Sequence, residues 1–407
     1  MQREVTIERL GAGGDGVAEN GPLFVPFTLP GERARVEIEP DGKHARLVEL
    51  IEPSKERVEP ICRHFGTCGG CALQHLELAA YLRWKQEQVV TTLRARGLDA
   101  EVEEVRAVPA GSRRRASFAL ERNREGLALG YKRVRSHELV NIETCPVLSP
   151  KIVASLEGLK AALAPFLHPK RELRLTLTET PQGLDLVVEG AKTSPSALVQ
   201  LGAHAAKLGI ARCTMNGELV AQFAAPTVEF SGAAVALPPG AFLQASAASE
   251  AVLVDLVREF VGTAKQIADL FAGLGTFAFA LAANASVDAF EEDGAALAAL
   301  GDAARKMSGL KPIRTFRRDL FGSPLGPKEL RRYDAVVFDP PRAGAMAQAE
   351  MLAKSEVRKL VAVSCNPGTL ARDLRILVDG GYRIGRVVPV DQFLFSPHIE
   401  VVAELSR

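Results

Sequence analysis

The chain has 407 residues, of which 47% are hydrophobic and 24% are charged, and its formal net charge is +1. This length allows two or three domains, and the composition is that of a globular protein rather than a disordered one. A net charge so close to zero excludes polyanion binding over the whole surface, so any nucleic-acid binding must come from local patches.

The N-terminal residues and the apolar stretches indicate neither export nor membrane insertion. The first residues contain no apolar run long enough for a secretory signal, and no run of about 18 apolar residues suggests a membrane span. We therefore expect a cytoplasmic protein. In that reducing compartment, cysteines are expected to be metal ligands, nucleophiles or buried thiols rather than disulfides. The cysteines are Cys62, Cys68, Cys71, Cys145, Cys213 and Cys365.

Residues 1–56 have the pattern of a small all-β domain. Polar and apolar residues alternate at 4–7 and 34–39, the stretch 23–27 is largely apolar, and glycines separate these segments. Short strands with frequent glycine turns are typical of small barrels. A barrel at this position could bind a ligand or serve only as a structural module.

Residues 57–238 form a less regular central region, for which the sequence predicts α+β structure. A helix is expected over 76–97, where leucine and valine recur with helical spacing among charged residues. This helix could pack on the last third of the chain instead of on the central region. Alternation at 173–178 and 184–189 predicts antiparallel strands.

Three cysteines lie close together at the start of the central region, and a fourth follows at a distance. The spacing Cys62-x5-Cys68-Gly-Gly-Cys71 brings three thiols into one loop, and Cys145-Pro146 could supply a fourth ligand. Four thiolates can hold an iron–sulfur cluster or a zinc ion, and this spacing with the Cys-Pro pair favours the cluster. Cys213 is expected to be a core thiol.

Basic residues are concentrated between positions 113 and 135. Only Glu121 and Glu125 oppose them, and Phe118 and Tyr131 lie among them. Such a tract in a nearly neutral chain predicts a contact surface for a polyanion, although a solvated charged face has the same composition. The basic residues are Arg113, Arg114, Arg115, Arg122, Arg124, Lys132, Arg133 and Arg135.

The last third, residues 239–407, alternates strand-like and helix-like segments. This βαβ pattern predicts an open, mostly parallel α/β sheet of the Rossmann type. The predicted fold class is therefore α/β, with the small barrel and the central α+β region preceding this sheet. The expected strands are 266–271, 287–291, 313–316, 333–338 and 360–364.

A tight glycine turn follows the first of these strands and leads into a helix. Gly273 and Gly275 would let the backbone pass close to a nucleotide-like ligand, although the third glycine of a dinucleotide fingerprint is missing. Glu291, at the end of the second strand, is placed to hold ribose hydroxyls. Asp319, after the third strand, could bond an adenine amino group or cap a helix.

Reactive side chains follow the last two parallel strands. Asp339 and Arg342 come directly after the strand at 333–338, in a loop that two prolines stiffen. Cys365 follows the strand at 360–364 and precedes a helix, whose dipole would stabilise a thiolate and make it a nucleophile. The alternative is an inert buried thiol, but ligands of open sheets bind at this edge.

Glu400 lies near the C-terminus between Ile399 and Val401. A carboxyl group with such apolar neighbours is expected to have a raised pKa, which suits a general base. His398 would share its face of the strand. A glutamate in a strand can also simply face solvent.

Several motifs of the chain match a known family. The last third contains Asp-Pro-Pro-Arg-Ala-Gly at 339–344 and Ser-Cys-Asn-Pro-Gly-Thr-Leu-Ala-Arg-Asp at 364–373. With these motifs the chain resembles the RNA uridine-5-methyltransferases over nearly its whole length. The N-terminal segment, with Gly-Asp-Gly-Val-Ala at 14–18, resembles a TRAM RNA-binding barrel. The cysteine spacing is similar to that of the 4Fe–4S site in the 23S ribosomal RNA branch of the family.

The resemblance implies a Rossmann-like class I methyltransferase domain over 239–407 that binds S-adenosylmethionine. It implies that Cys365 is the nucleophile, that Glu400 accepts a proton and that Asp339 lies close to the target base and the cofactor. It also implies a 4Fe–4S cluster on Cys62, Cys68, Cys71 and Cys145. The implied cofactor-binding residues are Gln244, Phe271, Gly273, Gly275, Thr276, Glu291, Asp319 and Asp339.

The implied activity is methyl transfer from S-adenosylmethionine to carbon 5 of a uridine in RNA. The expected substrate is 23S ribosomal RNA, and the expected intermediate is a covalent Cys365 adduct at carbon 6. RNA is the partner expected for a monomeric enzyme without membrane contact. Two alternatives within methyl transfer are a transfer RNA uridine and an exocyclic amino group, which Asp-Pro-Pro also fits. A further alternative is a non-catalytic RNA chaperone with a barrel and a cluster.

Overall fold

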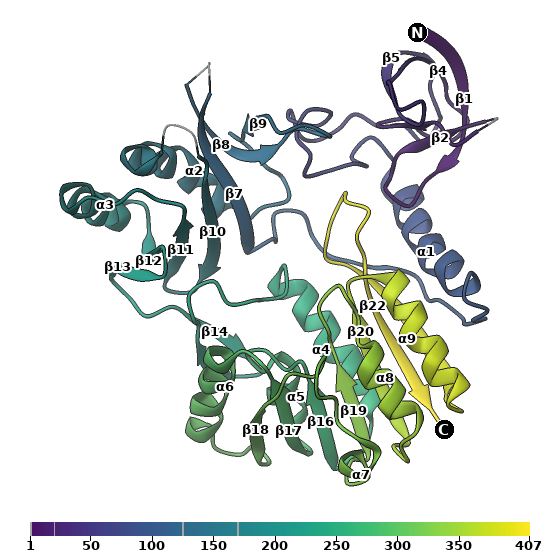
Figure 1. Ribbon diagram of the computed structural model, residues 1–407, viewed down its shortest axis with the longest axis vertical. Coiled ribbons are helices and arrows are strands. Elements are labelled where there is room, and N and C mark those ends of the chain that lie inside the picture. The colour runs from purple at the N-terminus through teal and green to yellow at the C-terminus, as the bar shows by residue number, and fades with distance from the viewer. Residues whose placement is uncertain (1, 20, 124–125, 169–170) are drawn as a thin grey trace.

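The computed structural model describes residues 2–19, 21–123, 126–168 and 171–407. Three regions are visible in Figure 1: the small N-terminal β domain, a central sheet with two helices on it, and a larger α/β domain that contains the C-terminus. In the described part of the chain, no helix combines the length and the apolar character needed to cross a membrane.

The N-terminal region is a five-stranded antiparallel sheet with the order β3-β2-β1-β4-β5. Val5, Ile7 and Val36 are buried inside it, as the alternating pattern predicted. The backbone N–H of Phe24 donates to the carbonyl of Lys43 over 2.8 Å, which brings the two edges together into a small barrel. The strands are β1 (Gln2–Leu10), β2 (Gly16–Ala18), β3 (Phe24–Val25), β4 (Arg33–Ile38) and β5 (Ala45–Glu52).

The central region is a seven-stranded sheet with the order β13-β12-β11-β10-β7-β8-β9, packed against two helices. Neighbouring strands are antiparallel except β11 and β12, which α3 connects. Cys213 is fully buried in this core, as expected from the sequence. The elements are β7 (Arg115–Asn123), β8 (Gly126–Lys132), β9 (Leu139–Asn141), α2 (Pro150–Leu163), η1 (Ala164–Phe166), β10 (Leu173–Thr180), β11 (Gly183–Glu189), α3 (Pro195–Lys207), β12 (Ile210–Met215) and β13 (Glu218–Gln222).

The C-terminal region contains an eight-stranded sheet with the order β18-β17-β16-β19-β20-β22-β21-β6. Its first five strands are parallel, and β22 lies antiparallel between β20 and β21. The five strands predicted from the sequence are all present. The strands are β6 (Arg106–Ala107), β16 (Gln266–Leu270), β17 (Ser286–Glu291), β18 (Ile313–Arg317), β19 (Ala335–Phe338), β20 (Lys359–Ser364), β21 (Arg383–Asp391) and β22 (Glu400–Ser406).

Helices cover both faces of this sheet, because side chains alternate along each buried strand. Val337 faces the cluster formed with α4, α5 and α6, whereas Phe338 faces the cluster formed with α1, α7, α8 and α9. Strand order reverses between β16 and β19, where the carboxyl ends of parallel strands leave a crevice for a ligand. The helices are α1 (Leu78–Arg94), α4 (Ala247–Val261), α5 (Thr276–Leu281), α6 (Gly294–Lys306), α7 (Pro327–Leu330), α8 (Met346–Ala353) and α9 (Pro367–Asp379).

The C-terminal sheet also recruits segments that precede residue 239. The helix predicted at 76–97 is α1, which packs on α9 through Val89 and Leu93, and β6 adds an edge strand next to β21. The hairpin of β14 (Thr227–Phe230) and β15 (Ala233–Ala236) packs against α5 and α6. Parts of the predicted 57–238 region thus belong to the C-terminal core. Helical spacing reveals an apolar face but not its partner, so the sequence could not decide this.

Candidate active site

The carboxyl ends of β16, β19 and β20 open into a cavity of about 790 Å³. The central sheet and the loop that contains Cys62, Cys68 and Cys71 complete its walls. Of the predicted site residues, those that line the cavity are Gln244, Phe271, Gly273, Glu291, Asp339, Cys365 and Glu400, together with Cys62, Cys68, Cys71 and Cys145. Gly275, Thr276 and Asp319 are not among the lining residues.

A chain of buried hydrogen bonds joins Asp339 to Glu400 through two glutamines. Gln244 Nε2 donates to Asp339 Oδ2 over 3.0 Å, and Gln392 Nε2 donates to Gln244 Oε1 over 2.9 Å. Gln392 Nε2 also donates to Glu400 Oε2 over 2.5 Å. The network connects residues that follow β15, β19 and β21 with the first residue of β22.

Burial raises the pKa of Glu400 well above its usual range, and the neighbouring charge of Asp339 adds to this rise. Burial likewise raises the pKa of Asp339. The raised pKa that the apolar neighbours predicted for Glu400 is therefore confirmed. A raised pKa makes the ionised form of this carboxyl group a stronger base.

Cys365 lies half-buried after β20, beside both carboxyl groups. Burial raises the pKa of its thiol to about 11, and the charges of Glu400 and Asp339 act in the same direction, while Arg342 opposes them. The expected stabilisation of a thiolate by the helix start is therefore wrong for the free protein. The side chain of Asn366, one residue later, caps α9, and burial with the two carboxyl groups raises the pKa of the thiol more than Arg342 lowers it.

The loop at 339–344 is fastened to the start of α9. Asn366 Nδ2 and Thr369 Oγ1 both donate to the carbonyl of Arg342, over 3.1 and 3.3 Å. Gly344 has a φ of +79°, and a Cβ there would clash with side chains of α9. The turn from β19 and the turn from β20 are therefore held together, which fixes Asp339 next to Cys365.

His398 lies in the loop before β22 rather than on the strand with Glu400, so the prediction that they share a strand face is wrong. Both side chains still line the cavity. Arg342 Nη2 lies 3.1 Å from His398 Nδ1. Burial lowers the pKa of His398, and the charge of Arg342 lowers it further, so a neutral imidazole is favoured.

The first two parallel strands form the part of the cavity suited to a nucleoside. Glu291 Oε2 accepts a hydrogen bond from the backbone N–H of Gly273 over 2.9 Å. Nothing lies within 4 Å of a Cβ built on Gly273, so this turn leaves room for a ligand. The rings of Phe271 and Phe321 pack with centroids 5.5 Å apart. A carboxylate for hydroxyl groups beside an aromatic wall is suited to ribose and adenine.

The second glycine of the turn serves the packing of helices. A Cβ on Gly275 would come within 2.9 Å of Leu300 and Phe279 side-chain atoms, so its role is close packing rather than room for a ligand. Asp319 accepts hydrogen bonds from the backbone N–H groups of Phe321 and Gly322, over 2.9 and 3.1 Å. Asp319 thus stabilises a turn, and the alternative that it caps a helix is wrong, since the next helix begins only at Pro327.

The four cysteines predicted as cluster ligands all line the cavity. The thiols of Cys62, Cys68, Cys71 and Cys145 are all half-buried. Burial raises the pKa of Cys71 to about 12, and the charges of the other thiols of this group add to the rise. The loop is anchored on both sides, since Gly69 N donates to Lys132 O of β8 over 2.9 Å and Ala72 N donates to Phe395 O over 2.9 Å.

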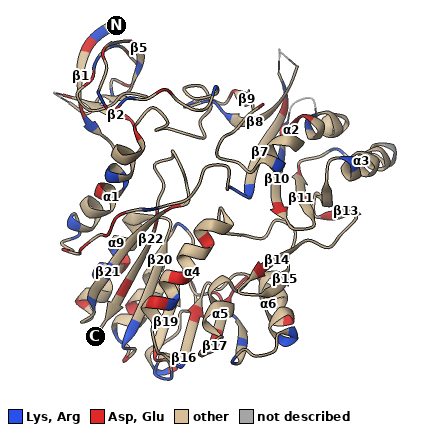
Figure 2. Ribbon diagram, turned by 180° about the vertical axis from the view of Figure 1, so that it is seen from behind, with Lys and Arg blue, Asp and Glu red and all other residues tan. Residues whose placement is uncertain are grey.

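Of the eight basic residues in the tract at 113–135, four form ion pairs in the described part of the chain, three of them with acids distant in the sequence. Arg114 Nη2 lies 2.6 Å from Glu250 on α4, and Lys132 Nζ lies 2.6 Å from Glu172. Two further ion pairs join Arg133 to Glu138 and Arg135 to Asp15. Figure 2 shows basic and acidic residues interspersed over all three regions. The tract therefore fastens regions of the chain together more than it offers a continuous basic surface.

Two further features of this tract differ from the prediction. Phe118 is buried in the central core, where its ring lies 5.1 Å from that of Tyr131, so these aromatic rings do not alternate with charges on a surface. Arg124 and Glu125 lie outside the described residues. Arg113 lines the cavity, and its guanidinium lies 5.8 Å from the ring centroid of Phe393.

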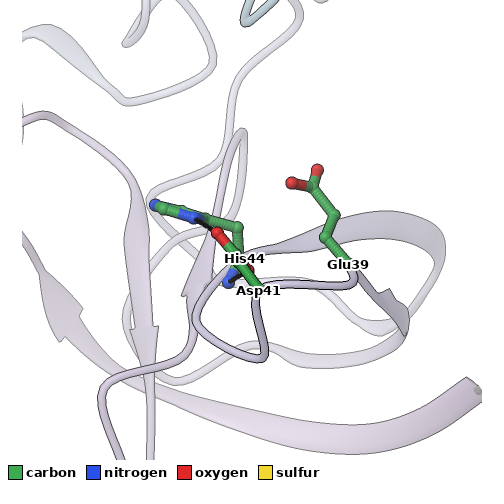
Figure 3. Close-up of side chains that lie close together, drawn as sticks. All are labelled: Glu39, Asp41 and His44. Carbon is green, nitrogen blue, oxygen red and sulfur yellow. Dashed lines mark hydrogen bonds and ion pairs between the residues drawn. The ribbon is translucent and has the colours of Figure 1, made fainter.

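A second group of polar side chains lies on the N-terminal barrel. Glu39, Asp41 and His44 come close enough to hold a metal ion (Figure 3). Asp41 Oδ1 accepts hydrogen bonds from the backbone N–H groups of Lys43 and His44, over 2.9 and 3.0 Å. This geometry belongs to a turn-stabilising aspartate, and it accounts for the group without a ligand.

No sequence motif marked two buried side chains at the cavity: Gln392, which lines it, and Lys85, which does not. Gln392 makes the hydrogen bonds described above. Lys85 on α1 is fully buried, forms an ion pair with Asp391 and donates to the carbonyl of His398 over 2.6 Å. A lysine in a charged amphipathic helix is normally predicted to be exposed. Only an unusually apolar helix face around Lys85 could have indicated that it is buried.

Comparisons with known proteins cover both the site and the whole chain. A family model described as tRNA (uracil-5-)-methyltransferase matches residues 305–407, which include Asp339, Cys365 and Glu400. An RNA methyltransferase of Rhizobium meliloti (strain 1021) is 48% identical over 99% of both chains. The 23S rRNA (uracil(1939)-C(5))-methyltransferase RlmD of Chromohalobacter salexigens is 34% identical over 99% of this chain and 89% of its own.

The fold is similar to that of a solved enzyme. The structure of Pyrococcus abyssi tRNA (uracil-54, C5)-methyltransferase, in complex with S-adenosyl-L-homocysteine, matches with a TM-score of 0.76. The identity is 24%, and the match covers 99% of both chains. The family that the sequence motifs indicated is thus confirmed. The chain belongs to the S-adenosylmethionine-dependent RNA (uracil-5-)-methyltransferases.

Proposed function

We propose that this protein transfers a methyl group from S-adenosylmethionine to carbon 5 of a uridine in RNA, with 23S ribosomal RNA as its substrate. The observation that carries this proposal is the gathering of Cys365, Asp339 and Glu400 in one cavity, with hydrogen bonds linking the two carboxyl groups. A thiol and a buried carboxyl group are the nucleophile and the base that a poorly reactive uracil carbon requires.

The cofactor would lie between the turn after β16 and the end of β17. Glu291 would bind the ribose hydroxyls, Phe271 and Phe321 would contact the adenine, and Gly273 leaves the space for both. Gln244 would contact the cofactor from the opposite side. When bound, S-adenosylmethionine supplies an electrophilic methyl group. For Thr276 and Asp319 only the family resemblance supports a cofactor contact.

Cys365 would add to carbon 6 of the uracil as a thiolate, which turns the ring into an enolate with a nucleophilic carbon 5. Carbon 5 then takes the methyl group, and the sulfonium leaves as a thioether. Glu400 would remove the carbon 5 proton, after which the carbon–sulfur bond breaks and Cys365 leaves as a thiolate. The target base must leave its stack to enter the cavity. Because the free thiol has a raised pKa, Cys365 must lose its proton before it adds to carbon 6.

Two features support ribosomal RNA over transfer RNA. The relative of 34% identity is named for 23S rRNA, and the four gathered cysteines fit the branch of the family with a cluster. The N-terminal barrel is proposed as a TRAM-like RNA-binding module that works together with Arg113 at the cavity. Transfer RNA is the second candidate, since a transfer RNA enzyme shares the fold. We further propose a monomer that acts in the cytoplasm.

The test is nucleoside mass spectrometry after incubation with labelled S-adenosylmethionine. We expect labelled 5-methyluridine on 23S ribosomal RNA that lacks its own modification, and little on transfer RNA. Fragment mapping then locates the uridine. Label on an adenine or guanine would contradict the reaction, and preferential labelling of transfer RNA would contradict only the substrate.

The residues around the four cysteines fit a 4Fe–4S cluster, which we propose as a structural group. All four ligands would be thiols, and backbone N–H groups point at their sulfur atoms: Gly70 N donates to Cys68 Sγ over 3.4 Å, and Val147 and Leu148 donate to Cys145. Cysteine thiolates with such hydrogen bonds are the usual ligands of iron–sulfur clusters. The methyl transfer itself moves no electrons, so no step depends on this group.

Replacement of Cys145 by serine is expected to remove the cluster and lower thermal stability, because one of four ligands is lost. The protein purified without oxygen should lose its iron, its acid-labile sulfide and its visible absorbance, whereas Cys213→Ala should keep all three. Zinc in place of iron in the wild-type protein would support the alternative metal. A Cys145→Ser protein with full iron content would show that Cys145 is not a ligand.

A further inference from the structure

Gln392 is the least accounted for of the buried side chains around the cavity. It follows β21 directly and is only 4% exposed. Its Nε2 donates to Gln244 Oε1 over 2.9 Å and to Glu400 Oε2 over 2.5 Å. Both donor hydrogens of the amide are therefore used, one on a residue proposed to contact the cofactor and one on the proposed base.

The other end of the amide fixes its orientation. Gln392 Oε1 accepts from the backbone N–H of Ala245 over 3.0 Å and from Ser249 Oγ over 3.1 Å. A backbone N–H can only donate, so the atom facing Ala245 must be the oxygen. The amide cannot be flipped without losing this bond, and its nitrogen must face Gln244 and Glu400.

This orientation makes the two oxygens of Glu400 different. Oε2 is held by Gln392, whereas Oε1 is buried and has no hydrogen-bond partner in the described structure. Glu400 lines the cavity, so Oε1 is the oxygen available to a proton from the substrate. A buried acceptor without a partner costs stability, and such groups are retained where function uses them.

We propose that Gln392 is a positioning residue for the proton-abstraction step: by holding Oε2 of Glu400, it presents Oε1 to carbon 5 of the methylated uracil, and it couples this base to Gln244. The proposal rests on the proposed function. Gln392 does not itself touch the reacting atoms. It acts through Glu400, whose proton transfer follows methyl transfer while Cys365 is still bonded to carbon 6.

Gln392 also affects the charge state of Glu400, because its hydrogen bond favours the ionised carboxylate. Burial and the charge of Asp339 raise its pKa, and the hydrogen bond from Gln392 lowers it. Loss of Gln392 therefore leaves Glu400 ionised only at higher pH. The other charged or titratable groups that face this part of the cavity are Cys365 after β20, Arg342 after β19, His398 before β22 and Arg113 before β7, with Lys85 of α1 behind His398.

Because methyl transfer precedes proton abstraction, a defect in proton abstraction can be detected by the covalent adduct that accumulates. When only proton abstraction is slowed, carbon 5 still receives its methyl group, but Cys365 stays covalently bound to carbon 6. Enzyme linked to labelled RNA then survives on a denaturing gel. A general loss of structure slows adduct formation as well and cannot produce this accumulation.

The test compares Gln392→Leu with wild type, using RNA and S-adenosylmethionine labelled in the methyl group. We expect turnover to fall about 10–100-fold, a fraction of what a general base contributes, with labelled adduct accumulating and the rising limb of turnover shifted to higher pH. Glu400→Gln should trap the same adduct more completely. Gln392→Met, with a more flexible apolar side chain, replaces Gln392→Leu if that protein does not fold.

Gln348→Leu is the matched control. Gln348 is also a buried glutamine of the same domain, and both ends of its amide bond to the backbone of Leu325, over 2.8 and 3.1 Å. It does not line the cavity. Its loss should lower the melting temperature without accumulation of adduct.

Two results would overturn the role of Gln392. One is wild-type turnover in Gln392→Leu. The other is slow turnover in which adduct formation is slowed by the same factor and no adduct accumulates. In both cases wild type and Glu400→Gln behave as the methyltransferase mechanism requires, so the proposed function stands. Wild type that forms no 5-methyluridine on any RNA would instead refute the function, and the role of Gln392 with it.

Discussion

Replacement of Cys365 by alanine is expected to abolish 5-methyluridine formation, with turnover falling by about 10⁴-fold or more, because carbon 5 of uracil becomes nucleophilic only after a nucleophile adds to carbon 6. The thiol is half-buried beside Asp339 and Glu400, and Cys365 is the only cysteine of residues 239–407. Mass spectrometry of nucleosides after labelling measures the loss. No covalent enzyme–RNA complex should form.

Cys213→Ala is the control for this variant. Cys213 is fully buried in the core of the central sheet, away from the cavity, so its loss should cost some stability but leave turnover intact. Methylation that survives in Cys365→Ala would exclude the covalent mechanism. It would favour transfer to an exocyclic amino group, a reaction in which Asp-Pro-Pro at 339–341 suffices without a nucleophilic thiol.

The dependence of this step on pH follows from the surroundings of the thiol. Burial and two carboxyl groups raise the pKa of Cys365 to about 11, so the free protein holds it protonated at neutral pH. The rate of adduct formation should therefore rise as the pH increases from 7 towards 9, since the thiolate fraction rises. Single-turnover measurement of the covalent complex on a denaturing gel tests this. A rate that stays constant over this range would mean that substrate binding itself removes the proton.

The gathering of Asp339 and Cys365 could be predicted because it follows from one rule. Side chains placed just after parallel strands meet at one edge of the sheet, and the sequence marked both strands clearly. Glu400 belongs to a different strand, β22, which runs antiparallel to its neighbours, so spacing alone could not place it beside Cys365. For Glu400 the family resemblance supplied what local pattern could not.

Long-range polar pairing is what the sequence could not reveal. Arg114 and Glu250 are 136 positions apart and still form a close ion pair, so the charge of the tract at 113–135 was overestimated. Gly273 and Gly275 look alike in sequence, but one faces open space and the other packs under Leu300. Gln392 follows a strand and belongs to no recognisable motif. Three of its four hydrogen bonds are to residues more than a hundred positions away in the sequence. Such roles depend on the tertiary partner rather than on the residue type.

The loop between β21 and β22, residues 392–399, depends on a buried cation from a distant helix. Lys85 on α1 is fully buried, and its ammonium forms an ion pair with Asp391 directly before the loop. It also donates to the carbonyl of His398 over 2.6 Å at the end of the loop. Tyr81, one turn earlier, donates to Asp391 over 2.7 Å and accepts from the backbone N–H of Phe395 over 2.8 Å. Lys85 therefore joins both ends of the loop that contains Gln392 and leads to Glu400.

Replacement of Lys85 by methionine is expected to lower the free energy of unfolding by about 3–5 kcal/mol, because it leaves the carboxylate of Asp391 buried without its counter-ion. Methionine keeps the volume of the aliphatic chain, so cavity formation contributes little. Urea unfolding of the purified protein measures the change. The double variant Lys85→Met/Asp391→Asn should recover part of the loss, since no unpaired charge remains in it.

Lys359→Met is the control that shows whether the loss of stability comes from burial of the ion pair or from the loss of any ion pair. Lys359 Nζ lies 3.2 Å from Glu404, but these side chains are 32% and 24% exposed, so its loss should cost less than about 1 kcal/mol. If Lys85→Met cost no more than Lys359→Met, the ion pair with Asp391 would not hold the loop. If Lys85→Met instead costs several kcal/mol more than Lys359→Met, and turnover falls as well, then the position of Glu400 depends on α1. Lys85 of this helix lies about three hundred residues before Asp391 in the sequence.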